Sequence, residues 1–176
     1  LSGGCCLGAD PGSPAFGVPG AVSLARWEGE GWAVTAVEAL CSLDAGRFRS
    51  PLLSAVTRLM PLASNQPLLV DSPGVVRGVA GAELLEGLAA ATGAGAAVIL
   101  ARPGGRLPLV AEATALGLSV YPVEAVPVAR RPGKRRRARA RTGLWQAYLG
   151  DAPPRRLDWE RLSLVGTPPP RTALEA

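Results

Sequence analysis

Residues 66–78 read QPLLVDSPGVVRG, and this stretch decides how the rest of the chain is interpreted. Four apolar residues run directly into Asp71, and Pro73 and Gly74 then end the run. An apolar run between such breakers predicts a strand that is buried on both faces, as in a parallel sheet with helices above and below. Ligands of such sheets bind at the carboxyl ends of the strands, which is where Asp71 and the following turn lie.

The beginning of the chain repeats this design. The apolar run over residues 5–9 leads into Asp10, and Pro11 and Gly12 follow. Two carboxylates at two strand ends, each followed by a glycine turn, indicate a nucleotide-and-metal site. The alternative is that both aspartates only cap ordinary turns between a strand and a helix.

The composition limits the class of protein. The 176 residues suffice for one domain with a sizeable core. Aromatic residues make up 5%, and the apolar content is mainly Ala, Val and Leu, which fits small helices packed on a sheet. No apolar run approaches the roughly 20 residues of a membrane span, and no signal peptide is visible, so we expect a cytoplasmic protein.

The chain contains no histidine, and its three cysteines lack paired ligand spacing. Histidine-based catalytic triads and most structural zinc sites are therefore excluded. The odd number of cysteines argues against a disulfide framework. We expect Cys5, Cys6 and Cys41 to be buried thiols.

The positive charge is concentrated in one arginine-rich segment. The chain has 18 arginines and one lysine, and residues 130–141 alone hold eight positive side chains. Subtracting these eight from the net charge of +5 leaves −3 for the rest of the chain. The segment therefore marks one anion-facing element rather than a generally basic protein.

Apolar periodicity predicts alternating strands and helices. After a strand that ends near Asp10, we expect a hairpin over 21–26 and 32–37, helices over 50–62, 80–91 and 107–116, and strands over 66–71, 96–101 and 118–128. Ser50 would cap the first of these helices, with Pro51 in its first turn. This alternation is typical of an α/β fold.

The last part of the chain changes character. Residues 134–141 read KRRRARAR, and an apolar edge follows at Leu144, Trp145, Tyr148 and Leu149. We expect a basic helix that is broken at residues 151–154. Residues 162–165 would form a short strand in the remaining tail.

Four motifs, taken in order, resemble the P-loop polynucleotide 5′-hydroxyl kinases of pre-mRNA cleavage and ribosomal-RNA processing. They are GADPGS at 8–13, VPGAVSL at 18–24, SPGVVRG at 72–78 and RRPGKRRRARARTGLWQAYL at 130–149. The family has a D-x-D-x-G-Q strand end, a P-G-x-x-S-L segment, a T-x-G-W-V-K-G clasp and an arginine-rich lid. The resemblance implies an α/β, P-loop NTPase-like fold with a mostly parallel sheet, flanking helices, a hairpin insertion and a helical lid. It implies a kinase domain over 1–150, its lid at 130–149, and a tail or the start of a β domain over 151–176.

The resemblance also implies a role for individual residues. Asp10 matches the acid that orients or deprotonates the 5′-hydroxyl and holds Mg²⁺ through water. Arg131 and Arg136 match the paired catalytic lid arginines, although a neighbouring arginine can substitute by a one-residue shift. Ser72 and Gly74 match the clasp, whose backbone approaches the nucleotide. Further phosphate or nucleic-acid contacts are expected from Arg77, Lys134, Arg135, Arg137 and Arg139.

The chain departs from the family pattern at several positions. Gly8 and Ser13 stand where the family has an acid and a glutamine, and Val75 stands at the position of the clasp tryptophan. The Walker A motif G-x-x-x-x-G-K-[ST] is absent, because Lys134 is the only lysine and lies in the basic run. We therefore expect a truncated member of the family that is inactive on its own.

The expected function is transfer of the ATP γ-phosphate to the 5′-hydroxyl of RNA or DNA, with Mg²⁺ as cofactor. No membrane partner is expected, and no protein partner is indicated. The sequence leaves two alternatives. One is a GTPase or ParA-like ATPase, since DSPG at 71–74 is similar to a switch motif. The other is a non-catalytic basic module that binds nucleic acid.

Overall fold

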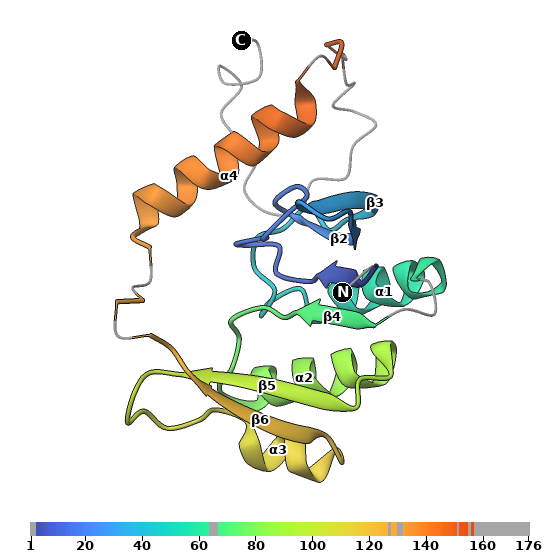
Figure 1. Ribbon diagram of the computed structural model, residues 1–176. Helices are drawn as coiled ribbons and strands as arrows, with labels where there is room; N and C mark the ends of the chain where they lie inside the picture. The colour runs from blue at the N-terminus through green and yellow to red at the C-terminus, as the bar shows by residue number, and fades with distance from the viewer. Residues whose placement is uncertain are drawn as a thin grey trace.

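The computed structural model describes residues 3–63, 67–126, 128–129, 132–150, 152–154 and 156 (Figure 1). Its elements follow one another as β1 (Cys5–Gly8), β2 (Ala21–Trp27), β3 (Trp32–Ala39), α1 (Arg49–Leu59), a 3₁₀ turn (Met60–Leu62), β4 (Leu68–Asp71), α2 (Gly78–Thr92), β5 (Ala96–Ala101), α3 (Val110–Ala115), β6 (Ser119–Glu124) and α4 (Lys134–Leu149). The predicted alternation of strands and helices is confirmed. The expected helix over 107–116 and the expected strand over 118–128 are both longer than α3 and β6.

The strands form two sheets rather than one mostly parallel sheet. The first has the order β3-β2-β1-β4, with β1 parallel to β4 and antiparallel to β2. The second pairs β5 with β6 in parallel. The predicted hairpin accounts for the mixed character, because residues 28–31 form a tight turn that reverses the chain and so makes β2 and β3 antiparallel. The expectation of a mostly parallel sheet was therefore wrong.

The main core lies between the first sheet and the helices α1 and α2. Leu7 and Leu24 project from β1 and β2, and Leu52 and Leu84 meet them from α1 and α2; each of these four side chains is at most 2% exposed. The apolar stripe of the first helix is thus confirmed. The prediction that Ser50 caps this helix was wrong. The helix α1 begins at Arg49, and its N-cap residue, Phe48, makes no side-chain capping hydrogen bond.

Helices cover only one face of β4 and β5 in the described part of the chain. The strand β1 is buried throughout, as predicted, but the side chains of Leu69, Val98 and Leu100 are 58–67% exposed. Figure 1 shows α2 and α3 on one side of the β5–β6 pair. The prediction that the strand over 66–71 is buried on both faces was therefore wrong, because the layer that would cover its second face is not among the described residues.

The helix α4 forms where the basic segment predicted it and lies alongside the β2–β3 hairpin (Figure 1). It ends before the predicted break, with Gly150 as its C-cap residue. The predicted short strand over 162–165 falls outside the described residues. None of the helices in the described ranges is both long and apolar enough to cross a membrane.

Candidate functional site

The two strand-end aspartates lie at the ends of neighbouring strands. In the parallel pairing of β1 with β4, Gly8 is opposite Asp71, and Asp10 follows two residues beyond Gly8. Burial raises the pKa of the Asp71 carboxyl above its usual range, and the negative charge of Asp10 raises it further. The two carboxylates therefore repel one another across the end of the sheet.

Asp10 also organises the turn that follows β1. Its Oδ1 accepts hydrogen bonds from the backbone N–H groups of Gly12, at 2.9 Å, and Ser13, at 3.2 Å. A side chain at position 12 would meet the carbonyl oxygen of Leu43 at 2.8 Å, so the close packing of this turn requires glycine. The alternative in which Asp10 only caps a turn therefore accounts for both hydrogen bonds to Oδ1. No hydrogen bond from the described residues reaches Oδ2, which remains available to a ligand.

A cavity of about 1170 Å³ opens beside these aspartates. Four segments line it: the loop after β1, residues 42–45 after β3, residues 73–75 after β4, and the amino-terminal half of α4 with Pro132. Asp10 lies on one wall. The cavity therefore collects the carboxyl ends of β1 and β4 and the basic helix around one space.

One face of α4 points its cations at this cavity. Lys134, Arg137 and Arg141 all line it, and their spacing of three and four residues places them on the same helix face. The Nη1 of Arg141 donates a hydrogen bond to the carbonyl oxygen of Gly12 at 3.2 Å. The Nε of Arg137 is buried and has no hydrogen-bond partner among the described residues. Arg137 lines the cavity between two further cations, so this side of α4 can bind an anionic ligand.

The structure brings together some of the predicted site residues and leaves others apart. Asp10, Gly74, Lys134 and Arg137 line the cavity. Ser72, Arg77, Arg135, Arg136 and Arg139 are exposed and do not line it. Arg131 lies outside the described residues. Because each helical residue turns by about 100°, a one-residue shift exchanges Arg136 for Arg137 at the cavity wall.

Two parts of the cavity wall were not singled out from the sequence. Arg141 belongs to the basic run, and its position four residues after Arg137 is the signal that places both on one face. Residues 42–45 carry no motif, and only the tertiary structure brings them to the site. Gly74 has open space beside it, since a Cβ there would meet nothing within 4 Å. No protein contact within the described residues therefore requires glycine at this position.

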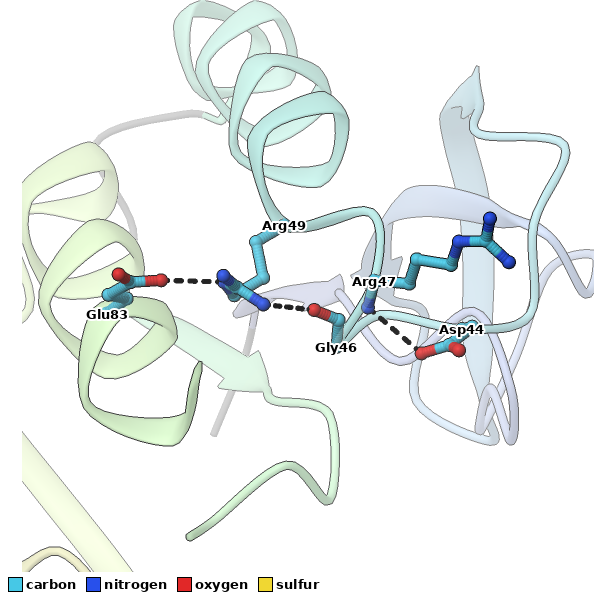
Figure 2. A network of polar contacts seen from close by, with 5 residues as sticks. All are labelled: Asp44, Gly46, Arg47, Arg49 and Glu83. Carbon is cyan, nitrogen blue, oxygen red and sulfur yellow. Dashed lines mark hydrogen bonds and ion pairs between the residues drawn. The ribbon is translucent and has the colours of Figure 1, made fainter. Parts of the chain in front are cut away.

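A polar network holds the 42–45 wall against the helices (Figure 2). The backbone N–H of Arg47 donates to Asp44 at 3.0 Å, and the guanidinium of Arg49 donates to the carbonyl oxygen of Gly46. Arg49 also forms an ion pair with Glu83 of α2 at 2.8 Å. This pair is partly exposed and contributes only about 0–1 kcal/mol, so its role is to fix the loop relative to α2.

The acidic groups suit Mg²⁺ better than a metal bound entirely by protein. No cluster of three or more potential metal-binding side chains occurs in the parts of the chain that the structure describes. Mg²⁺ is usually held by one or two carboxylates, with water and substrate phosphates completing its shell. Asp10 supplies one carboxylate at the cavity wall, whereas Asp71, whose pKa the charge of Asp10 raises, does not line the cavity.

The chain has a mixed α/β fold with a cavity at the carboxyl ends of β1 and β4. Among solved structures, a chain of the complex of Pcf11p and Clp1p, whose description concerns their extended interface and ATP loss in a point mutant, matches with a TM-score of 0.63 at 13% identity. The match covers 82% of this chain and 42% of that one, so the chain spans less than half of this neighbour's length. No family model and no curated protein matches the sequence. The likeness establishes the fold alone.

Proposed function

We propose that the chain is the acceptor-side and lid portion of a polynucleotide 5′-hydroxyl kinase, which transfers the ATP γ-phosphate to the 5′-hydroxyl of RNA or DNA. The observation that carries the proposal is that Asp10 and three cations of α4, Lys134, Arg137 and Arg141, line one cavity. A phosphoryl group needs cationic donors, and its attacking hydroxyl needs a base. Both requirements meet in this one space. The order of the four motifs and the fold of the neighbour support the same function.

The residues divide the chemistry between them. Asp10 Oδ1 is held by the turn, so Oδ2 accepts the proton of the 5′-hydroxyl as its oxygen attacks the γ-phosphorus. The new bond joins this oxygen to the phosphorus, and the bond between the γ-phosphorus and the β–γ bridging oxygen breaks. Lys134, Arg137 and Arg141 stabilise the negative charge on the transferring group. Asp10 would hold Mg²⁺ in this cavity, and the ion would neutralise charge on the phosphate oxygens.

A phosphate-cradling loop is needed in addition, and the 176 residues contain no Walker A motif. The transfer assay therefore uses this chain joined to a segment that carries G-x-x-x-x-G-K-[ST]. We expect labelled γ-phosphate to appear on 5′-hydroxyl oligonucleotides and not on 5′-phosphorylated ones. Asp10→Asn should lower kcat at least about 100-fold and leave oligonucleotide affinity nearly unchanged. Equal turnover of the variant would reject Asp10 as the base.

The non-catalytic alternative has its own observation. Arg135, Arg136 and Arg139 are exposed on α4 away from the cavity, as expected of a helix that binds a nucleic-acid backbone. A binding module of this kind would hold oligonucleotides with either 5′ end equally. A clear preference for the 5′-hydroxyl in equilibrium binding, together with phosphate transfer, would exclude it.

A further inference from the structure

A second cavity, of about 490 Å³, lies at the other end of α4. Residues 18–21 and residues between Val37 and Leu43 line this cavity. Trp145 and Tyr148 of α4 complete the lining. The lining is mostly apolar and aromatic. The mechanism proposed above uses none of these side chains.

The two cavities are neighbours and share part of their lining. Ser42 and Leu43 line both of them. Along α4, Arg137 and Arg141 face the first cavity, and Trp145 follows Arg141 by four residues on the same helix face. Four residues of helix advance about 6 Å, which is on the scale of one nucleotide unit. One face of α4 therefore passes from cations to aromatic rings within that distance.

The aromatic pair presents a surface on which a planar group can stack. The rings of Trp145 and Tyr148 are 6.1 Å apart and lie edge to face at 82°. Trp145 is 41% exposed and Tyr148 is 60% exposed. Proteins that bind single-stranded nucleic acid combine such stacking side chains with a cationic track for the backbone.

We propose that the second cavity binds the base of the 5′-terminal nucleotide, stacked on Trp145, while its 5′-hydroxyl lies in the first cavity at Asp10. This inference rests on the proposed function and names a substrate contact for it. A nucleotide fits better than a peptide, because the adjoining face of α4 carries Lys134, Arg137 and Arg141 and so matches phosphates rather than a neutral chain.

The test measures binding of this chain to 5′-hydroxyl hexanucleotides that carry fluorescein at the 3′ end, by fluorescence anisotropy. One oligonucleotide is intact, a second has an abasic first position, and a third has an abasic fourth position. Base stacking on an aromatic side chain is worth about 5- to 100-fold in affinity, so the wild-type chain should bind the second oligonucleotide about 10-fold more weakly than the first. The third should bind nearly as well as the intact one.

Variants locate the effect on α4. Trp145→Ala should bind the intact oligonucleotide about 10-fold more weakly and should no longer distinguish it from the abasic one. Trp145→Phe should retain most of the discrimination. Trp27→Ala is the matched control, because Trp27 packs edge to face on Trp32 at the far end of the hairpin and lines neither cavity. It should leave the discrimination intact.

The possible failures can be told apart. Equal affinity of wild type for the intact oligonucleotide and the first-position abasic one would overturn the base site, whatever the behaviour of the variants. If labelled γ-phosphate were still transferred to 5′-hydroxyl oligonucleotides in that case, the proposed function would stand. A Trp145→Ala variant that melts earlier but binds normally would show that the rings only pack against protein, and would also overturn the site. Retained base discrimination without any preference for a 5′-hydroxyl would support the site and count against the kinase function.

Discussion

Arg141 of α4 donates a hydrogen bond to the carbonyl oxygen of Gly12, which lies 129 positions earlier and two residues after the catalytic candidate Asp10. This bond connects the basic helix to the turn that Asp10 organises, so the position of α4 and the shape of the turn depend on each other. It is a charge-assisted bond on a partly buried donor, and such bonds are worth about 1.5–3 kcal/mol at most.

The first prediction concerns the mobility of α4. Arg141→Ala should speed amide hydrogen exchange across residues 134–149, because the helix loses this polar anchor to the β1 turn. Arg135→Ala, which removes an exposed arginine from the same helix, is the control and should leave exchange nearly unchanged. Equal exchange in Arg141→Ala and wild type would mean that the aromatic end alone holds the helix.

The second prediction concerns the ordering of α4 by ligand. Arg135 with Arg139, and Arg137 with Arg141, are like-charged pairs four residues apart, and each costs the helix roughly 0.2–0.5 kcal/mol. No ion pair in the described ranges involves α4. Phosphates that neutralise these arginines should therefore slow exchange across 134–142 when an ATP analogue and oligonucleotide are added to the chain joined to a Walker A segment. Exchange that is already slow without ligand would identify a static basic patch.

The third prediction distinguishes the catalytic role of Arg137 from the binding role of Arg136. The resemblance assigns Arg136 to the catalytic pair, whereas in the structure Arg137 lines the cavity and Arg136 is exposed away from it. Arg137→Ala should lower kcat by about 100-fold or more, because its charge is needed where negative charge develops. Arg136→Ala should weaken oligonucleotide binding mainly at low salt. The reverse pattern would restore the original assignment.

The sequence predicted the parts of the fold that depend on local pattern. The hairpin, the apolar stripe of α1 and the extent of α4 follow from periods of two and 3.6 residues, and each is confirmed. The sequence placed Asp10 and Asp71 at strand ends, and parallel strands bring their carboxyl ends to one edge of a sheet. The two residues lie near each other because β1 and β4 are neighbouring strands, which only the structure shows.

What the sequence did not predict depends on long-range packing. An apolar run such as LLV does not reveal that the side chain of Leu69 is exposed on one face of β4. Its burial depends on whether a helix packs on that face. The sequence places arginines on several faces of α4 and does not show which face meets the cavity. In the structure, the hydrogen bond of Arg141 to Gly12 turns the face of Arg137 and Arg141 toward it. Cys41, predicted to be buried, is exposed, because it lies in the loop after β3 rather than in a strand.

The fourth prediction concerns the pH dependence of stability at Asp71. Its pKa is raised in the folded protein, so the native state holds this proton more tightly than the unfolded chain does. Stability is therefore lost as the pH rises from about 3.9 through the native pKa, and the loss persists above it. Asp71→Asn should raise the Tm at pH 7 and should change it little below about pH 3. A lower Tm of the variant at pH 7 would show that the charged carboxylate has a stabilising partner.

The last prediction concerns the three thiols. Cys5 and Cys6 are 4% and 3% exposed, and Cys41 is exposed at the wall of the second cavity. Burial, together with the charge of Asp71, raises the pKa of Cys6 to about 11, so this thiol remains protonated and unreactive up to about pH 10. A maleimide at pH 7.5 should therefore modify one thiol rapidly in the native chain and all three after denaturation in guanidinium.

Cys41→Ser should abolish the fast phase, whereas Cys6→Ala should leave it unchanged. Because Cys41 lines the cavity assigned to the terminal base, a saturating 5′-hydroxyl oligonucleotide should slow the fast phase, and its abasic counterpart should slow it less. Rapid modification of two thiols in the native chain would show that β1 opens readily. Equal protection by both oligonucleotides would indicate that the nucleic acid reaches Cys41 with its backbone rather than with its base.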